Sequence, residues 1–335
     1  MIRTIINTTD LQDGDWQFLR PKMSDAEYAW QTYTSKAQKI RPAIGDGARL
    51  RRLKACVNAT RAAQQAEHPI LISHLPIMAA WTNLARKVMA RTVPQIAFAF
   101  NFTNLPTGMR RHAYAHALSG IEEFVVFSTY EKNLYAEFFG LPAERLHFTK
   151  WAMDTPIAGP RTRIIPDVPY LCAIGGEARD YALLSRVMQR LPHRQAVVVA
   201  RPYSVAGFDF PGNVQVHLNL PSETTWRVAV DSVGMALPLR SRETMCGHIT
   251  VVAAQLLGIP LIATDCLGLS DYVNEESAFR IVPPKDPDAL AGAIEDLFLQ
   301  RDNAKETAAK SKIQAQSEYS LDRWVAYLEE AVRRL

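Results

Sequence analysis

The sequence contains only four cysteines in 335 residues, and they are scattered along the chain. They are Cys56, Cys172, Cys246 and Cys266, with no Cys-x-x-Cys pair and no histidine at a ligand-like spacing. This distribution excludes a disulfide framework and argues against a zinc site. It fits a protein that works in a reducing compartment.

Long apolar runs are also missing. The longest apolar stretch, residues 69–85, is interrupted by His74, Pro76 and Asn83, which argues against a membrane-spanning helix. The first ten residues, MIRTIINTTD, lead directly into a strand-like run and lack the pattern of a signal peptide. We therefore expect a cytoplasmic protein, with the inner face of a membrane as an alternative location.

The composition is that of an ordinary soluble globular protein, with 48% hydrophobic and 21% charged residues. The length is sufficient for two domains, each with its own core. Charge is distributed unevenly: residues 1–150 contain 19 Lys and Arg against 12 Asp and Glu, whereas the remainder contains 19 against 22. Basic side chains are concentrated in residues 36–61.

Three interpretations of this basic segment remain open. It could be a solvated helix face, or it could contact anionic lipid headgroups or a phosphorylated acceptor, because each basic residue near such a surface contributes about 1 kcal/mol. Nucleic acid is the weakest of the three, because no nucleic-acid-binding motif accompanies the charge.

Apolar strand-like runs alternate with helix-like segments throughout the chain, which predicts an α/β protein with parallel sheets. The predicted strands cover residues 4–7, 70–73, 95–100, 124–128, 147–150, 170–174, 196–200, 214–217, 235–237, 261–264 and 280–282. The predicted helices cover residues 25–39, 47–67, 79–91, 110–120, 129–139, 178–191, 221–231, 249–257, 269–273 and 287–300.

A proline-rich segment divides the chain. Residues 154–169 contain four prolines in sixteen residues, which predicts a linker between two domains. We expect an N-terminal Rossmann-like domain at 1–153 and a C-terminal one at 170–319, facing each other across a central cleft. Residues 320–335 have the spacing of an amphipathic helix that needs a partner surface, and the N-terminal domain is one candidate.

Two loops of the second half have the composition of an anion site. The predicted strand 170–174 runs into Gly175 and Gly176, with Arg179 at the start of the next helix. The second loop opens a helix at 247–250, where Gly247 permits close approach and the amides of His248, Ile249 and Thr250 are first-turn donors. Helix N-termini and arginine forks both bind phosphate, so these loops together predict a diphosphate site.

Residues 247–284, GHITVVAAQLLGIPLIATDCLGLSDYVNEESAFRIVPP, resemble the donor-binding domain of family 4 glycosyltransferases, which have the GT-B fold. The following KDPDALAGAIEDLF resembles the same domain, and residues 125–154 resemble the end of the family's first domain. The resemblance implies transfer of a sugar from a nucleotide diphosphosugar with retention of configuration and without a metal ion.

The same resemblance assigns roles to particular residues. Arg179 takes the place of a basic residue that neutralises the donor diphosphate, and Arg201 is a second candidate for that role. The segment 247–250 matches the loop and helix start that hold the distal phosphate and the sugar. Residues Leu218 to Pro221, together with His217, match the segment whose backbone meets the nucleobase, and Leu218 and Leu220 are the candidate contacts.

The sequence departs from the family in its carboxylates. The family typically carries two glutamates eight positions apart, one facing the sugar and one holding the ribose hydroxyls. Here Met245 and Ala253 stand at those positions. Glu243 lies close enough to replace the first glutamate, but nothing in the motif replaces the second.

The first half supplies three further candidates. Gly14 lies in Asp-Gly-Asp after the first strand, where the family often has a glycine facing the donor sugar. His74 ends a predicted strand, where a core histidine bonded to backbone is the competing interpretation. Asn101 stands where family members often have a histidine near the reacting carbon.

We therefore predict a metal-independent hexosyltransferase in surface polysaccharide or glycolipid synthesis. Its substrates would be a nucleotide-sugar donor and a saccharide or lipid-linked acceptor, with peripheral contact to an anionic membrane through Lys36–Arg61. Two alternatives remain: a sugar-nucleotide-binding protein without turnover, which Ala253 favours, and a GT-B sugar-nucleotide epimerase, which would need more carboxylates than these loops contain.

Overall fold

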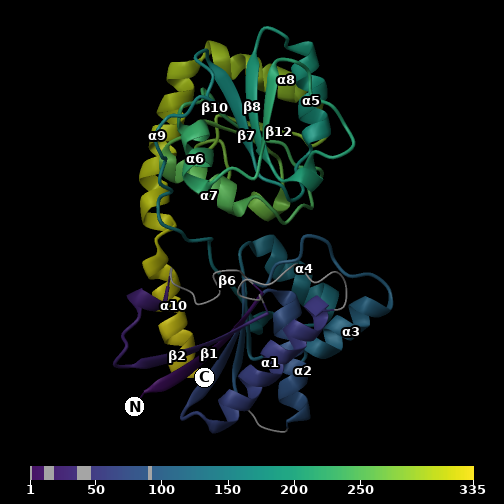
Figure 1. The fold of residues 1–335 in the computed structure, drawn as a ribbon, viewed down its shortest axis with the longest axis vertical. Helices are drawn as coiled ribbons and strands as arrows, with labels where there is room; N and C mark the ends of the chain where they lie inside the picture. Colours follow the sequence, from purple (N-terminus) through teal and green to yellow (C-terminus); the bar gives the residue numbers. More distant parts are fainter. Residues whose placement is uncertain (1, 11–18, 36–46, 90–92) are drawn as a thin grey trace. The chain divides into compact units, whose positions relative to one another are not determined.

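The computed structural model describes residues 2–10, 19–35, 47–89 and 93–335. The chain divides into two compact units (Figure 1). The first unit combines residues 1–149 with residues 321–335, and the second comprises residues 150–320. Every residue of the second unit is described.

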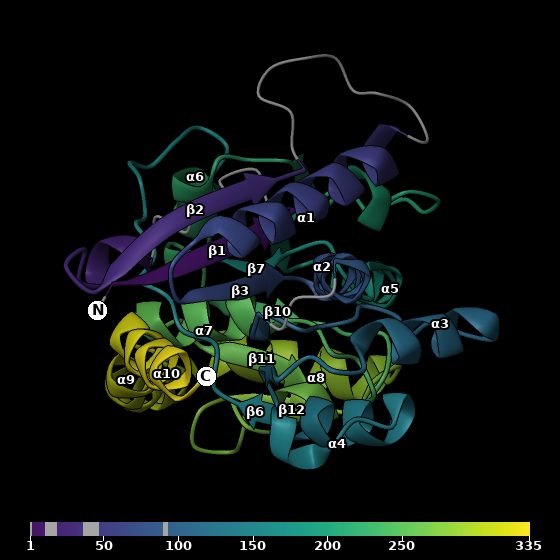
Figure 2. The same cartoon turned by 90° about the horizontal axis from the view of Figure 1, so that it is seen from below.

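The first unit is built on a parallel six-stranded sheet with the order β2-β1-β3-β4-β5-β6. Its strands are β1 (Arg3–Thr9), β2 (Tyr28–Thr34), β3 (Pro69–His74), β4 (Gln95–Phe98), β5 (Glu123–Val126) and β6 (Leu146–Phe148). Its helices are α1 (Gly47–Gln65), α2 (Pro76–Val88), α3 (Met109–Leu118), α4 (Thr129–Phe139) and α10 (Leu321–Arg334), with short 3₁₀ turns at Arg20–Lys22 and Ala143–Arg145. Figure 2 shows β2, β1 and β3 side by side with α1 lying across them.

Strand β4 shows how helices cover both faces of this sheet. Successive strand side chains point to opposite faces. Gln95 donates to the carbonyl of Ala79 in α2 (3.0 Å), whereas the Phe98 ring packs edge-on against Trp324 of α10, with ring centroids 5.1 Å apart. Helices α2 and α10 therefore lie on opposite faces, although about 240 residues of sequence separate them.

The second unit is built on another parallel six-stranded sheet, with the order β12-β11-β10-β7-β8-β9. Its strands are β7 (Tyr170–Ile174), β8 (Gln195–Ala200), β9 (Val214–Leu218), β10 (Gly234–Leu237), β11 (Leu261–Thr264) and β12 (Arg280–Val282). Its helices are α5 (Tyr181–Arg190), α6 (Ser222–Val230), α7 (His248–Leu257), α8 (Pro287–Leu299) and α9 (Arg301–Glu318), with 3₁₀ turns at Pro202–Ser204 and Leu267–Leu269. Strand order reverses between β7 and β10, the point where doubly wound sheets bind ligands.

Successive side chains of the second sheet pack into two separate hydrophobic cores, one on each face. Tyr170, Cys172 and Ile174 of β7 join the core under α6, α7 and α9. Leu171 and Ala173 join the core under α5 and α8. The segment 154–169, predicted as a linker, lies in this unit: Ile165 is buried in the first of these cores, and the amide of Gly159 donates to the carbonyl of Glu223 (3.0 Å).

Two parallel sheets with helices on both faces confirm the predicted α/β architecture, but two predicted helices are wrong and one helix is missing from the prediction. The predicted helix at 25–39 contains strand β2, whose Tyr-Ala-Trp-Gln-Thr-Tyr-Thr sequence is rich in aromatic and β-branched residues that favour strands; residues 36–39 lie outside the described ranges. The predicted helix at 269–273 is a 3₁₀ turn followed by irregular backbone. Helix α9 is absent from the predicted set, because it buries alanines rather than a stripe of large apolar residues.

Among the described residues, every helix is too short or too polar to span a lipid bilayer.

Candidate functional site

The candidate site lies at the carboxyl edge of the second sheet, where β7 and β10 are neighbours. The loop 175–180 follows β7, and the loop 238–247 follows β10. Backbone hydrogen bonds join the two loops: the amide of Asp180 donates to the carbonyl of Pro238 (2.9 Å), and the amide of Arg240 donates to that of Ala178 (3.1 Å). The two loops that the sequence singles out therefore form one surface at the reversal of strand order.

Arg179 is the central cation of this surface. Its side chain is 5% exposed, and its guanidinium donates to the carbonyls of Ile174 (3.1 Å) and Glu177 (2.9 Å) and to Oγ1 of Thr250 (2.8 Å). No carboxylate of the fully described second unit lies within ion-pair distance of it, and burial lowers its pKa. A buried guanidinium held by neutral acceptors is a strong site for an anion, because a buried charge is costly until it is paired.

Gly175 makes room for this guanidinium. Its φ is +121°, and a Cβ added there would lie 2.5 Å from Nη2 of Arg179. Gly176 makes room on the other side of the loop, where an added Cβ would lie 2.8 Å from Cγ of Arg201 and from the hydroxyl of Tyr203. Both glycines therefore make room for neighbouring side chains of the protein, and the close approach to a ligand that the sequence suggests stays a prediction.

Helix α7 begins beside Arg179. Its N-cap is Gly247 with φ +114°, and no side chain of the fully described second unit caps the helix start. Thr250 is buried and accepts from Arg179, whereas Ile249 is exposed. The first-turn amides have no intrahelical acceptors, so this end of the helix carries a partial positive charge next to the guanidinium.

His248 has a structural role in this helix start. It is buried, its Nε2 lies 2.8 Å from the carbonyl oxygen of Gly268, and its ring packs edge-on against Tyr272. Burial lowers the pKa of His248 to about 4, so the imidazole is neutral at pH 7. The His248 side chain therefore packs into the core, and only its backbone amide, as a first-turn amide of α7, can serve an anion at the helix start.

The loops after β8 and β9 carry the remaining predicted contacts. Arg201 is exposed and donates from Nη1 to the side-chain oxygen of Asn219 (3.0 Å). The hydroxyl of Tyr203 donates to the carboxylate of Glu177. Leu218, at the end of β9, is 47% exposed, and Leu220 packs against the core under α7. Tyr203 and Glu177 are not among the residues predicted from sequence, because a single tyrosine and a single glutamate in separate loops form no motif.

The two positions where the family's glutamates are expected lie in different environments. Met245 is buried, and Glu243 is exposed in a turn of the loop after β10. Ala253 is fully buried in the core on one face of α7. A small apolar residue fits that environment.

The first-unit candidates are placed as follows. His74 ends β3, is buried, and has its pKa lowered to about 4 by burial, so it is neutral at pH 7. Asn101 follows β4 and donates its side-chain amide to the carboxyl group of Glu131. Gly14 lies outside the described residues.

Glu131 is a buried acid beneath the loop that carries Asn101. Its carboxyl group also accepts from the amide of Phe127 (3.1 Å) and from the hydroxyls of Ser128 (3.2 Å) and Tyr135 (3.2 Å). Burial raises the pKa of Glu131 to about 7 despite these hydrogen bonds. The Ser-x-x-Glu spacing of 128–131 is a capping box, which is the sequence signal that could have identified this residue.

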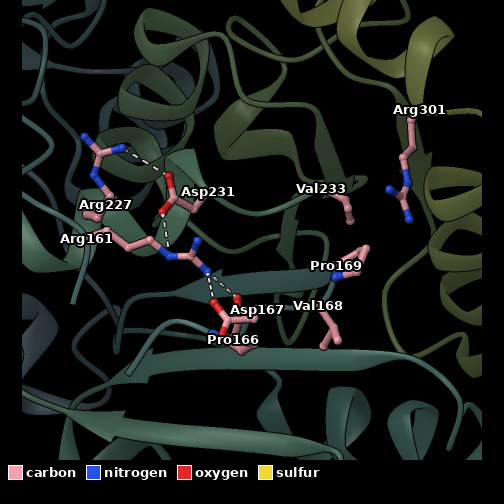
Figure 3. Close-up of a pocket in the computed structure, with 9 residues that line it drawn as sticks. All are labelled: Arg161, Pro166, Asp167, Val168, Pro169, Arg227, Asp231, Val233 and Arg301. Carbon is pink, nitrogen blue, oxygen red and sulfur yellow. Dashed lines mark hydrogen bonds and ion pairs between the residues drawn. The ribbon is translucent and has the colours of Figure 1, made fainter. Parts of the chain in front are cut away.

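A surface hollow of about 630 Å³ lies at the opposite, amino edge of the second sheet, beside the starts of β7 and β10. Figure 3 shows Arg161 between two carboxylates, with 2.9 Å to Asp167 and 3.8 Å to Asp231, while Arg227 pairs with Asp231 at 3.1 Å. Its charges neutralise one another largely within the hollow. It is therefore separate from the candidate site, which lies at the carboxyl edge.

A family model matches one part of the chain. Residues 212–300, which include the loop after β10 and helix α7, match the family model described as Glycosyl transferases group 1. No curated protein is similar enough in sequence to be counted as a relative.

Solved structures match the whole chain at low sequence identity. HepE of Anabaena in complex with UDP-glucose has a TM-score of 0.77 at 10% identity, with all of both chains covered. Sucrose-phosphate synthase of Thermosynechococcus elongatus has a TM-score of 0.71 at 14% identity, covering 99% of this chain and 88% of that one. A glycosyltransferase of Rickettsia africae has a TM-score of 0.71 at 13% identity, covering 99% and 98%.

The fold of this chain is therefore GT-B, as the sequence predicts. The family match covers residues 212–300, most of the carboxyl-terminal part of the second unit, and adds the group 1 glycosyltransferases to what this chain is similar to.

Proposed function

We propose that the chain transfers a glycosyl group from a nucleotide diphosphosugar, with retention of configuration. The observation that carries the proposal is Arg179, a buried cation with no carboxylate partner in its unit, beside the uncapped start of α7. Together they offer a fixed charge and several donors to one anion at the switch point of the sheet. HepE, which has the same fold, is described in complex with UDP-glucose, and this supports the donor class.

The same groups would assist the reaction. Negative charge grows on the diphosphate as its bond to the sugar breaks. Preorganised hydrogen-bond donors stabilise that growing charge more strongly than they stabilise the intact nucleotide sugar. The Arg179 guanidinium and the α7 amides would supply this stabilisation, so the proposal needs no metal ion. His248 is neutral and points its ring away into the core, so it takes no part in proton transfer.

We further propose that the acceptor is a saccharide or a lipid-linked saccharide in surface polysaccharide or glycolipid synthesis. Helix α1 supports a membrane-proximal acceptor, because Arg49, Lys54 and Arg61 are exposed on it together with Leu50, which is 66% exposed. Arg52 is not available for lipid, since it pairs with Asp10 at 2.6 Å. Flotation with anionic vesicles at low salt tests this contact, and the Lys54→Glu/Arg61→Glu variant should float less.

A binding protein without turnover is the second candidate. Ala253 favours it, because the residue that would hold the ribose in the family is replaced by a fully buried methyl group. The two candidates differ in one measurable respect. Both bind a nucleotide sugar, but only the transferase releases nucleotide when an acceptor is added.

The decisive experiment measures binding and turnover with a panel of nucleotide sugars and acceptors. Arg179→Ala should weaken donor binding on the order of 10- to 100-fold, the range for losing hydrogen bonds to a charged group. Arg190→Ala is the matched control, since Arg190 is an exposed arginine of the same unit whose partner is Asp288. Donor affinity unchanged by Arg179→Ala would overturn the site, and binding without turnover would establish the second candidate.

A further inference from the structure

The carboxyl edge of the second sheet contains a glutamate held in place by a tyrosine. Glu177 follows the glycine pair after β7, and its carboxylate accepts the hydroxyl of Tyr203, which follows β8. Gly176 lies between them, and a side chain there would collide with the Tyr203 hydroxyl at 2.8 Å. Because Gly176 has no side chain, Tyr203 in the loop after β8 can pass over the backbone of the loop after β7. Its hydroxyl then fixes the direction of the Glu177 carboxylate.

A nucleoside would lie on the side of the candidate site that has exposed apolar side chains. Tyr203 is 60% exposed, and Leu218 at the end of β9 is 47% exposed. On the other side of Arg179, Leu269 in the loop after β11 is buried, and the exposed Ile249 lies in the first turn of α7, where the diphosphate would bind. A base requires an apolar face to stack on. A nucleotide with its diphosphate at Arg179 would therefore extend across the ends of β8 and β9.

Glu177 is the carboxylate of the loop after β7 on that path, whereas Glu223 lies further along, in the first turn of α6 after β9. Asp180 caps α5 by accepting the amide of Leu183 (2.9 Å). Asp265 pairs with Arg242 at 3.1 Å, and Glu243 lies in the turn beside Arg242, on the β10 and β11 side of the site. Glu177 lies two residues before Arg179 and contacts Tyr203, so it joins the diphosphate position to the stacking surface.

We propose that Glu177, oriented by Tyr203, binds the ribose hydroxyls of the donor and takes over the role left vacant at Ala253. This inference rests on the proposed function and identifies a binding residue for it. A carboxylate accepts two hydroxyl hydrogens at once, which is why acidic residues hold ribose in other nucleotide-binding folds. One Glu177 oxygen is used by Tyr203, and the other is available to the sugar.

Tyr203 suits the orienting role. Loss of hydration at its hydroxyl group and the neighbouring Glu177 carboxylate together raise the pKa of Tyr203 to about 12, so its hydroxyl remains a donor across the neutral range. Its ring stays exposed for the base while its hydroxyl holds the carboxylate. One residue therefore serves two neighbouring parts of the nucleoside.

The test compares ribose with deoxyribose. Isothermal titration of the full chain with UDP, ADP and GDP, each beside its 2′-deoxy counterpart, gives the affinity ratio that depends on the 2′-hydroxyl. The native protein should favour the ribose form about 10-fold or more, as expected for a hydrogen bond to a charged group. Glu177→Ala should bring the ratio close to one, and Glu177→Gln should give an intermediate ratio because it keeps a neutral acceptor.

Controls separate this inference from the function on which it rests. Tyr203→Phe keeps the ring but loses the orienting hydrogen bond, and should lower the ribose preference while retaining most of the affinity. Glu306→Ala removes an exposed glutamate of α9 whose ion-pair partner is Lys310 in the same helix, and should leave the ratio unchanged. Thermal unfolding confirms that each variant is folded.

The outcomes are distinct. A full ribose preference in Glu177→Ala and Glu177→Gln, with binding lost in Arg179→Ala, overturns the role of Glu177 and leaves the proposed function standing. Absence of binding by any diphosphate of the panel to the native protein overturns both. If the ratio of ribose to deoxyribose affinity falls to about one in Glu177→Ala but is unchanged in Glu306→Ala, the ribose contact is established.

Discussion

At the scale of single residues, the candidate site depends on two missing groups, a Cβ atom at Gly175 and a carboxylate partner for Arg179. Gly175 lacks a Cβ, and this absence lets the guanidinium of Arg179 lie against the backbone. Arg179 lacks a carboxylate partner in its fully described unit, which is why we propose its charge for the ligand. Sequence reasoning identifies both residues, because a glycine pair after a strand and an arginine at a helix start are local patterns.

Gly175→Ala should reduce both stability and donor binding. The substitution forces an alanine to φ +121° and places its Cβ 2.5 Å from Nη2 of Arg179, so the guanidinium must move. Gly207→Ala is the matched control, since Gly207 has φ +90° with nothing within 4 Å of an added Cβ. Both variants should lose about 1–2 kcal/mol of unfolding free energy from backbone strain. Only Gly175→Ala should also bind nucleotide diphosphate at least 10-fold more weakly, as titration calorimetry would reveal.

Glu131 gives a prediction about pH. Its pKa is about 7 in the folded protein against 4.5 for a free side chain, so the folded state retains a proton that the unfolded state releases. The contribution of Glu131 to stability is therefore fully present below about pH 4.5 and is lost as the pH rises toward 7. Urea denaturation should show the native protein losing on the order of 1 kcal/mol per pH unit relative to Glu131→Gln between pH 5 and 7.

The comparison with Glu131→Gln is needed because other groups titrate in the opposite sense. Burial holds the pKa of His74 and of His248 near 4, so their protonation destabilises the fold as the pH falls. These contributions are common to both proteins and cancel in the difference. A pH-independent difference would show that Glu131 is already ionised in the folded state.

At the scale of secondary-structure elements, helix α9 packs through small residues. Its buried positions are Ala304, Ala308, Ser311 and Ala315, and it lies along α7, where Lys312 approaches Gly258. Small side chains let two helices approach closely. This explains why hydrophobic periodicity does not reveal α9, although its composition favours a helix.

Ala308→Leu should destabilise the protein by about 1–3 kcal/mol, because Ala308 is buried and added methyl groups must displace the helix. Ile313→Ala is the control on the same helix, since Ile313 is 73% exposed. The midpoint of urea denaturation should fall for the first variant and stay nearly constant for the second. Equal midpoints would show that α9 shifts away from α7 without cost.

Most elements follow from the sequence, and the exceptions have physical causes. Strands such as 170–174 are short apolar runs between turn residues, and pattern alone identifies them. The segment 25–39 misleads because Tyr28, Trp30 and Tyr33 fit either a helix face or a strand, and only pairing with β1 decides. At the site, Glu177 and Tyr203 meet through the fold, 26 residues apart, so no local motif could predict their contact.

At the scale of the whole molecule, helix α10 completes the first unit from the far end of the chain. Trp324 stacks on Phe127 with ring centroids 5.5 Å apart and meets Phe98 edge-on. Tyr327 stacks on His147 at 4.1 Å, and its hydroxyl donates to Glu123. The last helix is therefore part of the first unit's core.

Trp324→Ala should cost about 3–5 kcal/mol, the usual range for removing a buried large aromatic side chain. The loss should be confined to the first unit, so hydrogen exchange should accelerate in β4 and β5 while β7 and β8 remain protected. Arg323→Ala changes an exposed neighbour and should leave exchange unchanged. Unaltered protection of β4 in Trp324→Ala would contradict a core role for α10.

The placement of α10 also sets the order in which the units are completed during synthesis. The second unit is one continuous stretch, residues 150–320, so all of its strands have left the ribosome before α10 is made. The first unit is synthesised earlier, but its core is complete only when residues 321–335 cover Phe98 and Phe127. The half of the protein that is translated first is thus the half that is finished last.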